Sequence, residues 1–109
     1  MLKKVRVVFF DDRLEEEYLS LPENDKLKKR IDYVKERIKQ NPTFGQPIAK
    51  KLIPKEYKIC GIGNAYWVEL SKFGWRLIYT LTSEKRDEVT AIIIEWFTRH
   101  KDYERRFKY

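Results

Sequence analysis

The sequence feature that most constrains the fold is the segment VTAIIIEWFT, residues 89–98, in which apolar side chains occupy both odd and even positions. Successive side chains of a strand point to opposite faces of a sheet, so this segment needs cover on both faces. Such a pattern is typical of a central strand. Two earlier segments, AYWVELS at 65–71 and WRLIYTLT at 75–82, alternate in polarity and predict two further strands.

The N-terminal part of the chain predicts a strand followed by a helix. KKVRVVFF is rich in β-branched and aromatic residues and predicts a strand at about Lys3–Phe10. A helix is expected from Asp12, with Glu15 three positions later as its partner in a capping box. This helix ends before Pro22, which cannot continue it.

A second helix is marked by an apolar stripe on a surface otherwise built from Lys, Glu and Arg. Asn24 or Asp25 is expected to cap its first turn. Asn41 ends it, because a residue before proline (here Pro42) avoids the helical region. The short link between the two helices predicts an antiparallel helical hairpin. The stripe recurs at spacings of four, three and four residues and consists of Leu27, Ile31, Val34 and Ile38.

Residues 43–64 are less regular and predict a long ordered loop, with a short strand in YKICGI at 57–62. Loops of this length in a small domain are usually functional or pack across another element. The whole order is βααβββ followed by a short basic C-terminal segment. It predicts a single α+β domain over residues 1–109, with the helical hairpin on one sheet face and the other face partly open.

Composition limits the classes of function. The 109 residues suit one domain, and the formal net charge of +7 suggests a polyanionic partner such as nucleic acid, a ribosome or an acidic protein. The single cysteine excludes an intrachain disulfide, and one cysteine with one histidine cannot supply the four ligands of a structural zinc site. The N-terminal apolar run is too short for a signal peptide or a membrane helix, so we expect a cytoplasmic protein.

Arg76 is a charged residue inside a strongly apolar strand, and it allows two interpretations. It is either an exposed arginine that pairs with Glu69 on the neighbouring strand, or a guanidinium held on a rigid, concave sheet face. In the second case it would bind a phosphate through two parallel hydrogen bonds, which lysine cannot do.

The C-terminal segment 99–109 holds five Lys or Arg residues, the only histidine and three aromatic residues. Histidine exchanges a proton near neutral pH, which makes His100 a candidate acid or base. The aromatic residues, Tyr103 among them, either close the edge of the core or alternate with basic residues to bind phosphates and bases. The lysines of the long loop are either a solvated surface or an electrostatic rim for RNA.

Three stretches together resemble the RelE/ParE superfamily of toxins from toxin–antitoxin systems. They are AYWVELSKFGWRLIYTL, IIIEWFTRHKDYERRF and the two-helix N-terminal half, and they cover nearly the whole chain. The resemblance implies an antiparallel sheet of about four strands with an N-terminal helical hairpin. For the RelE branch it implies an mRNA endoribonuclease of the ribosomal A site, without metal or cofactor. The ribose 2′-OH attacks the adjacent phosphate and leaves a 2′,3′-cyclic phosphate.

The resemblance also implies roles for individual residues. Arg76 matches the sheet arginine of the family and would stabilise charge on the phosphate in the transition state. The basic segment after the last strand matches residues 99–103, although which residue takes the family's arginine position stays open. Its chemistry suits His100 as general acid or base and Tyr103 as the residue that stacks on a base or positions the 2′-OH. The predicted RNA-binding residues are Arg99, Lys101, Arg105, Arg106, Lys50, Lys51 and Lys58.

The strand before the glycine turn departs from the family pattern. Ribosome-dependent members carry lysines there, whereas this chain has Trp67 and Glu69. Three consequences stay open: Glu69 and His100 form an acid–base pair, loop lysines supply the charge, or cleavage is weak. The alternatives are therefore a ParE-like toxin that inhibits gyrase, and a catalytically weakened member that binds RNA or antitoxin. In each case the expected partner is an acidic, partly disordered antitoxin.

Overall fold

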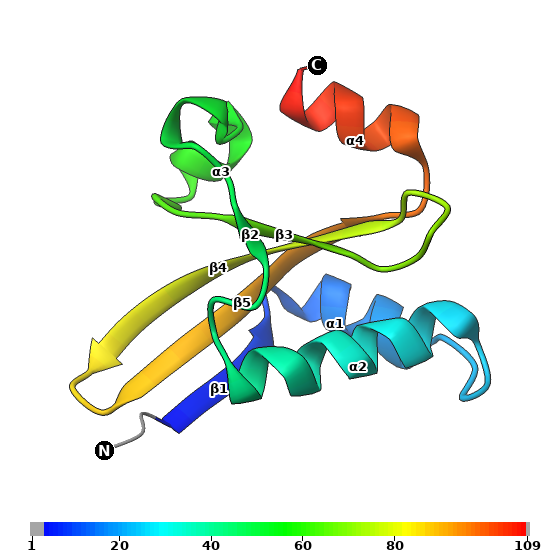
Figure 1. Cartoon of the computed structure of the whole chain (residues 1–109), viewed down its shortest axis with the longest axis horizontal. Coiled ribbons are helices and arrows are strands. Elements are labelled where there is room, and N and C mark those ends of the chain that lie inside the picture. Colours follow the sequence, from blue (N-terminus) through cyan, green and yellow to red (C-terminus); the bar gives the residue numbers. More distant parts are fainter. Residues whose placement is uncertain (1–3, 109) are drawn as a thin grey trace.

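The computed structural model describes residues 4–108, arranged as two groups of helices on either side of a twisted sheet (Figure 1). The described part of the predicted first strand begins at Lys4, and Lys3 lies outside the described residues. The elements are β1 Lys4–Phe9, α1 Asp12–Leu19, α2 Lys26–Gln40, β2 Gln46–Pro47, a 3-10 turn Lys50–Leu52, α3 Lys55–Ile59, β3 Tyr66–Glu69, β4 Arg76–Lys85, β5 Glu88–Phe97 and α4 His100–Phe107.

The sheet has five strands in the order β1-β5-β4-β3-β2. The three strands predicted at 65–71, 75–82 and 89–98 form an antiparallel meander, β3-β4-β5. The sheet differs from the expected antiparallel one at its edge, because β1 pairs with β5 in parallel. This pairing gives β5 a neighbour on both sides, as the apolar pattern of its sequence requires.

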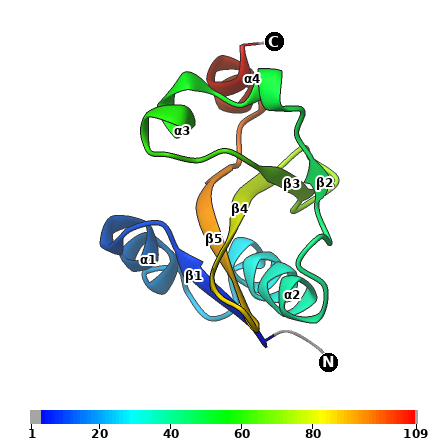
Figure 2. The same cartoon turned by 90° about the vertical axis from the view of Figure 1, so that its left-hand side faces the viewer.

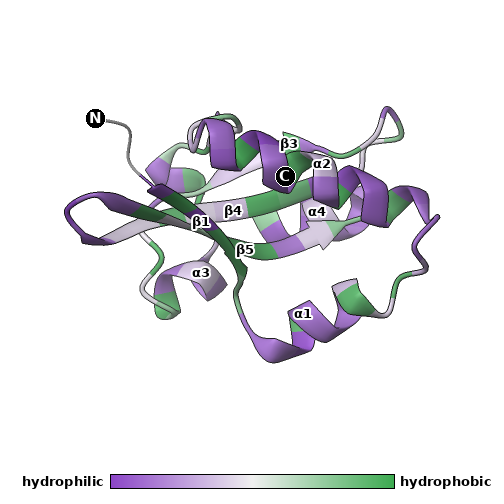
Figure 3. Ribbon diagram, turned by 90° about the horizontal axis from the view of Figure 1, so that it is seen from below, coloured by the Kyte–Doolittle hydropathy of each residue, from purple (hydrophilic) through white to green (hydrophobic). Residues whose placement is uncertain are grey.

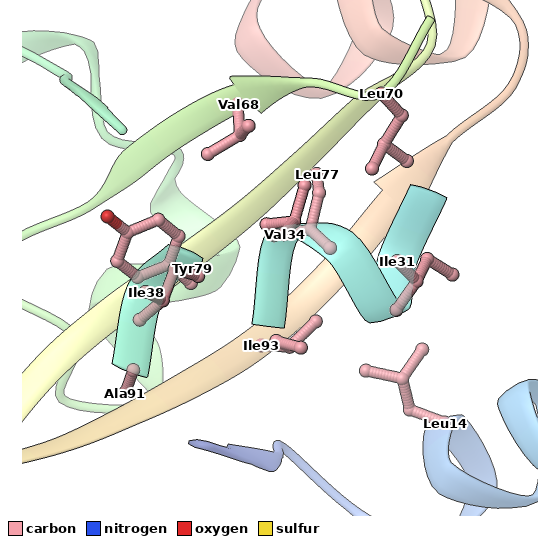
Figure 4. Close-up of a cluster of buried hydrophobic side chains, with 10 residues drawn as sticks. All are labelled: Leu14, Ile31, Val34, Ile38, Val68, Leu70, Leu77, Tyr79, Ala91 and Ile93. Atoms are coloured by element: carbon pink, nitrogen blue, oxygen red, sulfur yellow. The ribbon is translucent and has the colours of Figure 1, made fainter. Parts of the chain in front are cut away.

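One face of the sheet packs against α2, whose predicted stripe is buried. Ile31, Val34 and Ile38 meet side chains of β4 and β5 such as Tyr79 and Ile93 in the first core cluster (Figure 4). The outward sides of α1 and α2 are hydrophilic (Figure 3). The first core cluster consists of Leu14, Ile31, Val34, Ile38, Val68, Leu70, Leu77, Tyr79, Ala91 and Ile93.

The caps of the two N-terminal helices follow the sequence closely. Asp25, one of the two predicted caps of α2, accepts a hydrogen bond from the Leu27 amide at 2.7 Å. The capping box predicted from Asp12 is displaced by one residue, since Asp11 is the cap and accepts from the Leu14 amide at 2.9 Å. A carboxylate at either position satisfies the free amides of a first turn, which is why the sequence pattern did not separate them.

The opposite face of the sheet, away from α1 and α2, is covered by α3 and α4 (Figures 1 and 2). The predicted strand at 57–62 is wrong: this segment holds the end of α3, whose residue Tyr57 is buried. Pro54, which caps α3, already has the backbone φ of a first helical turn, and Gly61 at φ +80° ends the helical path. The second core cluster consists of Ile53, Tyr57, Ala65, Ile78, Phe97, Tyr103 and Phe107.

A β-bulge in β5 sets which side chains face α4. Ile78 pairs with Glu95 and the next residue, Tyr79, pairs with Ile93, so that Ile94 is an extra residue in β5. As a result Ile94 and Glu95 both lie on the face of the second core cluster.

None of the described helices is long and apolar enough to cross a membrane.

Candidate active site

Arg76 is the first residue of β4, and its side chain lies between two aromatic rings. The guanidinium carbon is 4.4 Å from the ring centroid of Trp67, on β3, and 4.5 Å from that of Tyr103, on α4. Both distances are within the range of a cation–π interaction. The sheet and the C-terminal helix therefore hold one guanidinium from two sides.

Among residues 4–108, no carboxylate neutralises the charge of Arg76. Glu69 is its register partner on β3, but no ion pair or hydrogen bond links the Arg76 side chain to any residue in the described range 4–108. Aromatic faces attract a cation without occupying its N–H donors as a carboxylate would. The half-buried guanidinium thus keeps its donors for an outside acceptor, which favours the second interpretation of this residue.

Tyr103 joins the candidate site to the core. Its side chain is 1% exposed, and its ring stacks on Phe107 with centroids 4.8 Å apart. It also meets the Phe97 ring edge to face, with centroids 5.7 Å apart. The residue therefore orients Arg76 as well as closing the core. Its predicted contact with a base would need the ring to become more exposed.

His100 lies next to Tyr103 in the first turn of α4. The two rings are inclined by 20°, with centroids 6.3 Å apart. The three residues predicted to be catalytic, Arg76, His100 and Tyr103, thus gather around one point of the fold. Arg76 comes from the start of β4, and the other two residues come from α4. This helix follows the end of β5, the strand that pairs with β4.

His100 is paired with Glu104. Glu104 is not among the site residues predicted from the sequence. The His100 Nε2 atom is 2.7 Å from the Glu104 Oε1 atom, and both side chains are substantially exposed. The spacing of four residues on a helix is the signal that could have identified the pair. A carboxylate at one ring nitrogen fixes the orientation of an imidazole and leaves the other nitrogen for proton exchange.

Arg99 and Lys101 flank His100 on the surface. Arg99 is the residue before α4 and makes no side-chain capping bond, and Lys101 is in the first turn. Both side chains are exposed, and neither forms an ion pair with another residue of the described range. They place two free cations beside the candidate acid or base.

Arg106 has a structural position instead. Its Nε and second terminal nitrogen lie 3.0 and 3.3 Å from the two carboxylate oxygens of Glu95, and its other terminal nitrogen lies 2.8 Å from Glu56. Tyr57 donates a hydrogen bond to the same Glu95. The pKa of the Tyr57 hydroxyl is raised, mainly by burial and in addition by the negative charge of Glu95. With its charge shared by two carboxylates, Arg106 offers little to a phosphate. Arg105, one residue earlier, is exposed.

α3, which belongs to the long loop with its lysines, lies on the same side of the sheet as α4 (Figure 1). Lys50 and Lys51 are in the 3-10 turn and Lys58 is in α3, and all three are exposed. Lys50 and Lys58 share an open hollow that is also lined by Ile53 and Gly61. Within residues 4–108, no group of three or more His, Cys, Asp or Glu side chains is placed to bind a metal ion.

No family model and no curated protein sequence matches this chain. Among solved structures, it is similar to the toxin RelE of E. coli, in a variant with two arginines replaced by alanine and in the free state. The TM-score is 0.53 at 16% sequence identity, and the match covers 99% of this chain and 96% of the other. This chain has a RelE-like fold. The expected fold class is confirmed.

Proposed function

We propose that this protein is the toxin of a toxin–antitoxin system and that it cleaves mRNA on the ribosome, in the cytoplasm. The observation that carries the proposal is the position of Arg76. Its guanidinium lies between Trp67 and Tyr103, without a carboxylate partner in the described chain, and the ring of the exposed His100 lies 6.3 Å from that of Tyr103, centroid to centroid. A rigid cation with free N–H donors next to a proton-exchanging group suits phosphate ester chemistry.

In this proposal the scissile phosphate binds to Arg76. The ribose 2′-OH attacks phosphorus and releases its proton to water, the bond from phosphorus to the 5′ oxygen breaks, and a 2′,3′-cyclic phosphate and a 5′-hydroxyl result. Arg76 stabilises the charge that develops on the phosphate oxygens. His100, oriented by Glu104, donates the proton that the leaving 5′ oxygen requires. No metal ion is assigned a role in these steps.

Exposed cations around this point would bind the neighbouring phosphates of the RNA. Arg99 and Lys101 lie beside His100, and Arg105 follows on the same helix. Lys50, Lys51 and Lys58 extend the positive surface over α3. Binding through such contacts weakens as salt concentration rises, because bound phosphates release their counterions. An acidic antitoxin would be attracted to the same surface.

A second candidate function is RNA or antitoxin binding without efficient cleavage. The observation that favours it is Glu69, an exposed acid directly opposite Arg76 in the sheet register. A carboxylate there repels the phosphate that Arg76 attracts. Under this candidate function, Glu69→Lys should raise RNA cleavage. Unchanged cleavage by Glu69→Lys would show that Glu69 does not limit the reaction.

Mapping of mRNA 5′ ends in a translation extract tests the proposed function. Cuts inside translated reading frames, present only when ribosomes are present and leaving 2′,3′-cyclic phosphate ends, are the expected result. Cuts in free RNA would contradict ribosome dependence. An absence of cuts in both samples would contradict the nuclease and would leave the binding function or a gyrase-inhibiting toxin to be tested.

A further inference from the structure

A second feature of the surface lies at the connection between β3 and β4, where the chain turns against the start of α2. Phe73 projects from this connection and is 73% exposed. It borders a pocket whose surface is almost entirely apolar. This turn pocket is lined by Lys26, Lys29 and Arg30 of α2 and by Ser71, Lys72, Phe73 and Trp75 of the connection.

Four of these seven residues are cations. None of Lys26, Lys29, Arg30 and Lys72 forms an ion pair with a carboxylate in the part of the chain that the structure describes. The Lys72 ammonium lies 5.8 Å from the ring centroid of Phe73. The turn pocket is therefore an apolar floor surrounded by positive charge.

The turn pocket is anchored to the fold rather than formed by a loose loop. Arg30 donates a hydrogen bond from its Nε atom to the carbonyl oxygen of Leu70, a fully buried residue that directly follows β3. The Leu70 amide donates in turn to the Trp75 carbonyl at 2.6 Å and closes the connection. These bonds fix α2, Trp75 and the end of β3 relative to one another.

The turn pocket and the candidate active site lie on opposite faces of the sheet. Trp75 packs against the first core cluster, on the side of α2. The next residue, Arg76, contacts Trp67 and Tyr103 on the side of α4. Because neighbouring residues of a strand point to opposite faces, a molecule in the turn pocket would leave Arg76 uncovered.

We propose that the turn pocket binds an acidic, amphipathic segment of a protein partner. One apolar side chain of that segment enters between Phe73 and Trp75, and carboxylates beside it meet the four cations. An apolar floor with a charged rim is the arrangement of a protein interface centred on a hydrophobic anchor. A nucleotide base would bring polar edges into a pocket with almost no polar surface, at a cost in desolvation. The inference is independent of RNA cleavage.

Fluorescence anisotropy with a labelled synthetic peptide tests this proposal. The probe is an acidic amphipathic helix of about 15 residues, a length at which helices begin to be stable, with leucines on one face and glutamates elsewhere. We expect Phe73→Ala to weaken its binding about tenfold or more, as truncation of a central interface aromatic does. Lys29→Glu should also weaken it. Lys85→Glu, an equal charge change at the exposed end of β4, should not.

Two further measurements keep the result interpretable. A peptide of the same composition in scrambled order, without an apolar face, should bind the wild type more weakly. Thermal unfolding of Phe73→Ala should match the wild type, since the side chain is exposed. Equal affinity of wild type and Phe73→Ala for the helical peptide would overturn the proposal, and so would no binding at about 1 mM, the weak limit of specific association. If Phe73→Ala lost affinity for a single-stranded uridine oligonucleotide but not for the peptide, the turn pocket would be an RNA site and the proposal would be overturned.

Discussion

At the scale of single residues, the account depends on how Arg76 is held. A flexible arginine loses conformational entropy when it binds a phosphate, and the two rings reduce that loss by restricting the side chain beforehand. Trp67 was noted in the sequence only as a departure from the family pattern. In the structure it supplies one side of the guanidinium contact, at 4.4 Å. We therefore assign it a positioning role.

Replacement of Trp67 tests that role. Trp67→Ala should lower the rate of mRNA cleavage about tenfold, because a cation–π contact at a partly desolvated site contributes on the order of 1 kcal/mol and also orients the cation. Trp67→Phe keeps an aromatic face and should recover most of the rate. The measurement is the single-turnover cleavage rate, beside the thermal unfolding midpoint of each variant. Equal rates for Trp67→Ala and wild type would exclude the positioning role.

At the scale of elements, the candidate site depends on the attachment of α4, which carries His100 and Tyr103. Arg106 ties this helix to β5 through Glu95 and to α3 through Glu56. Phe107 adds an edge-to-face contact with Tyr57 of α3, with ring centroids 5.9 Å apart. The helix is thus joined both to β5, which precedes it in the chain, and to α3, which is distant in sequence.

Removal of the Arg106 guanidinium should loosen α4. Arg106→Met should destabilise the protein by about 1 kcal/mol, a value near the upper end for a partly exposed pair, because Glu95 loses its partner. Amide hydrogen exchange in α4 should rise more than in α2. Arg105→Met, on the same helix and exposed, is the matched control and should change neither quantity. Unchanged exchange in α4 of Arg106→Met would show that packing alone holds the helix.

Tyr79 makes a second link between elements and predicts a dependence on pH. Its hydroxyl donates to the Pro42 carbonyl at 2.8 Å and accepts from the Gly45 amide at 2.9 Å. Burial raises the pKa of Tyr79 from 10.0 to about 12, although the Gly45 hydrogen bond acts in the opposite direction. The folded state thus keeps a proton that the unfolded chain loses, so this contribution to stability is complete below about pH 10 and is lost towards pH 12.

Urea unfolding at a series of pH values measures this effect. The free energy of unfolding should fall as pH rises from 10 to 12, and Tyr18, whose pKa burial also raises to about 12, contributes with the same sign. Tyr79→Phe should have a smaller slope. It should also be less stable at neutral pH by about 1–3 kcal/mol, because the buried Gly45 amide loses its acceptor. An identical slope in both proteins would exclude Tyr79 as a source of the pH dependence.

At the scale of the whole molecule, the parts predicted correctly are those that a local pattern specifies. The stripe on α2 and the three strands of the meander each follow from side-chain periodicity within one segment. The helical state of α3 could not be predicted because its five residues span little more than one turn, too short for an apolar stripe to repeat. The burial of Tyr57 against β5 and α4 decides it. The parallel pairing of β1 with β5 was missed for a related reason, since the two strands are far apart in the chain.

The same distinction applies to the candidate site. Arg76 was identified because a charge interrupts an apolar strand, and His100 because it is the only histidine in a basic segment. The network of Arg106 involves Glu95 and Glu56, 11 and 50 positions away, and no pattern in the sequence relates them. Pairings of this kind depend on the register of β5 and on its bulge. Contacts between distant segments therefore decide which cations pair with carboxylates and which are left for a ligand.

The measurement that tests the central claim most directly is the single-turnover rate of mRNA cleavage on programmed ribosomes for wild type, Arg76→Ala and Arg105→Ala. We predict a loss of about a hundredfold or more for Arg76→Ala, the usual effect of removing one preorganised charge donor, and a small loss for Arg105→Ala. Arg76→Lys, which keeps the charge but not the planar donors, should lie between them. Equal thermal midpoints would show that the fold is intact. A folded Arg76→Ala that cleaves like the wild type would contradict the assignment of this arginine as the phosphate-binding centre.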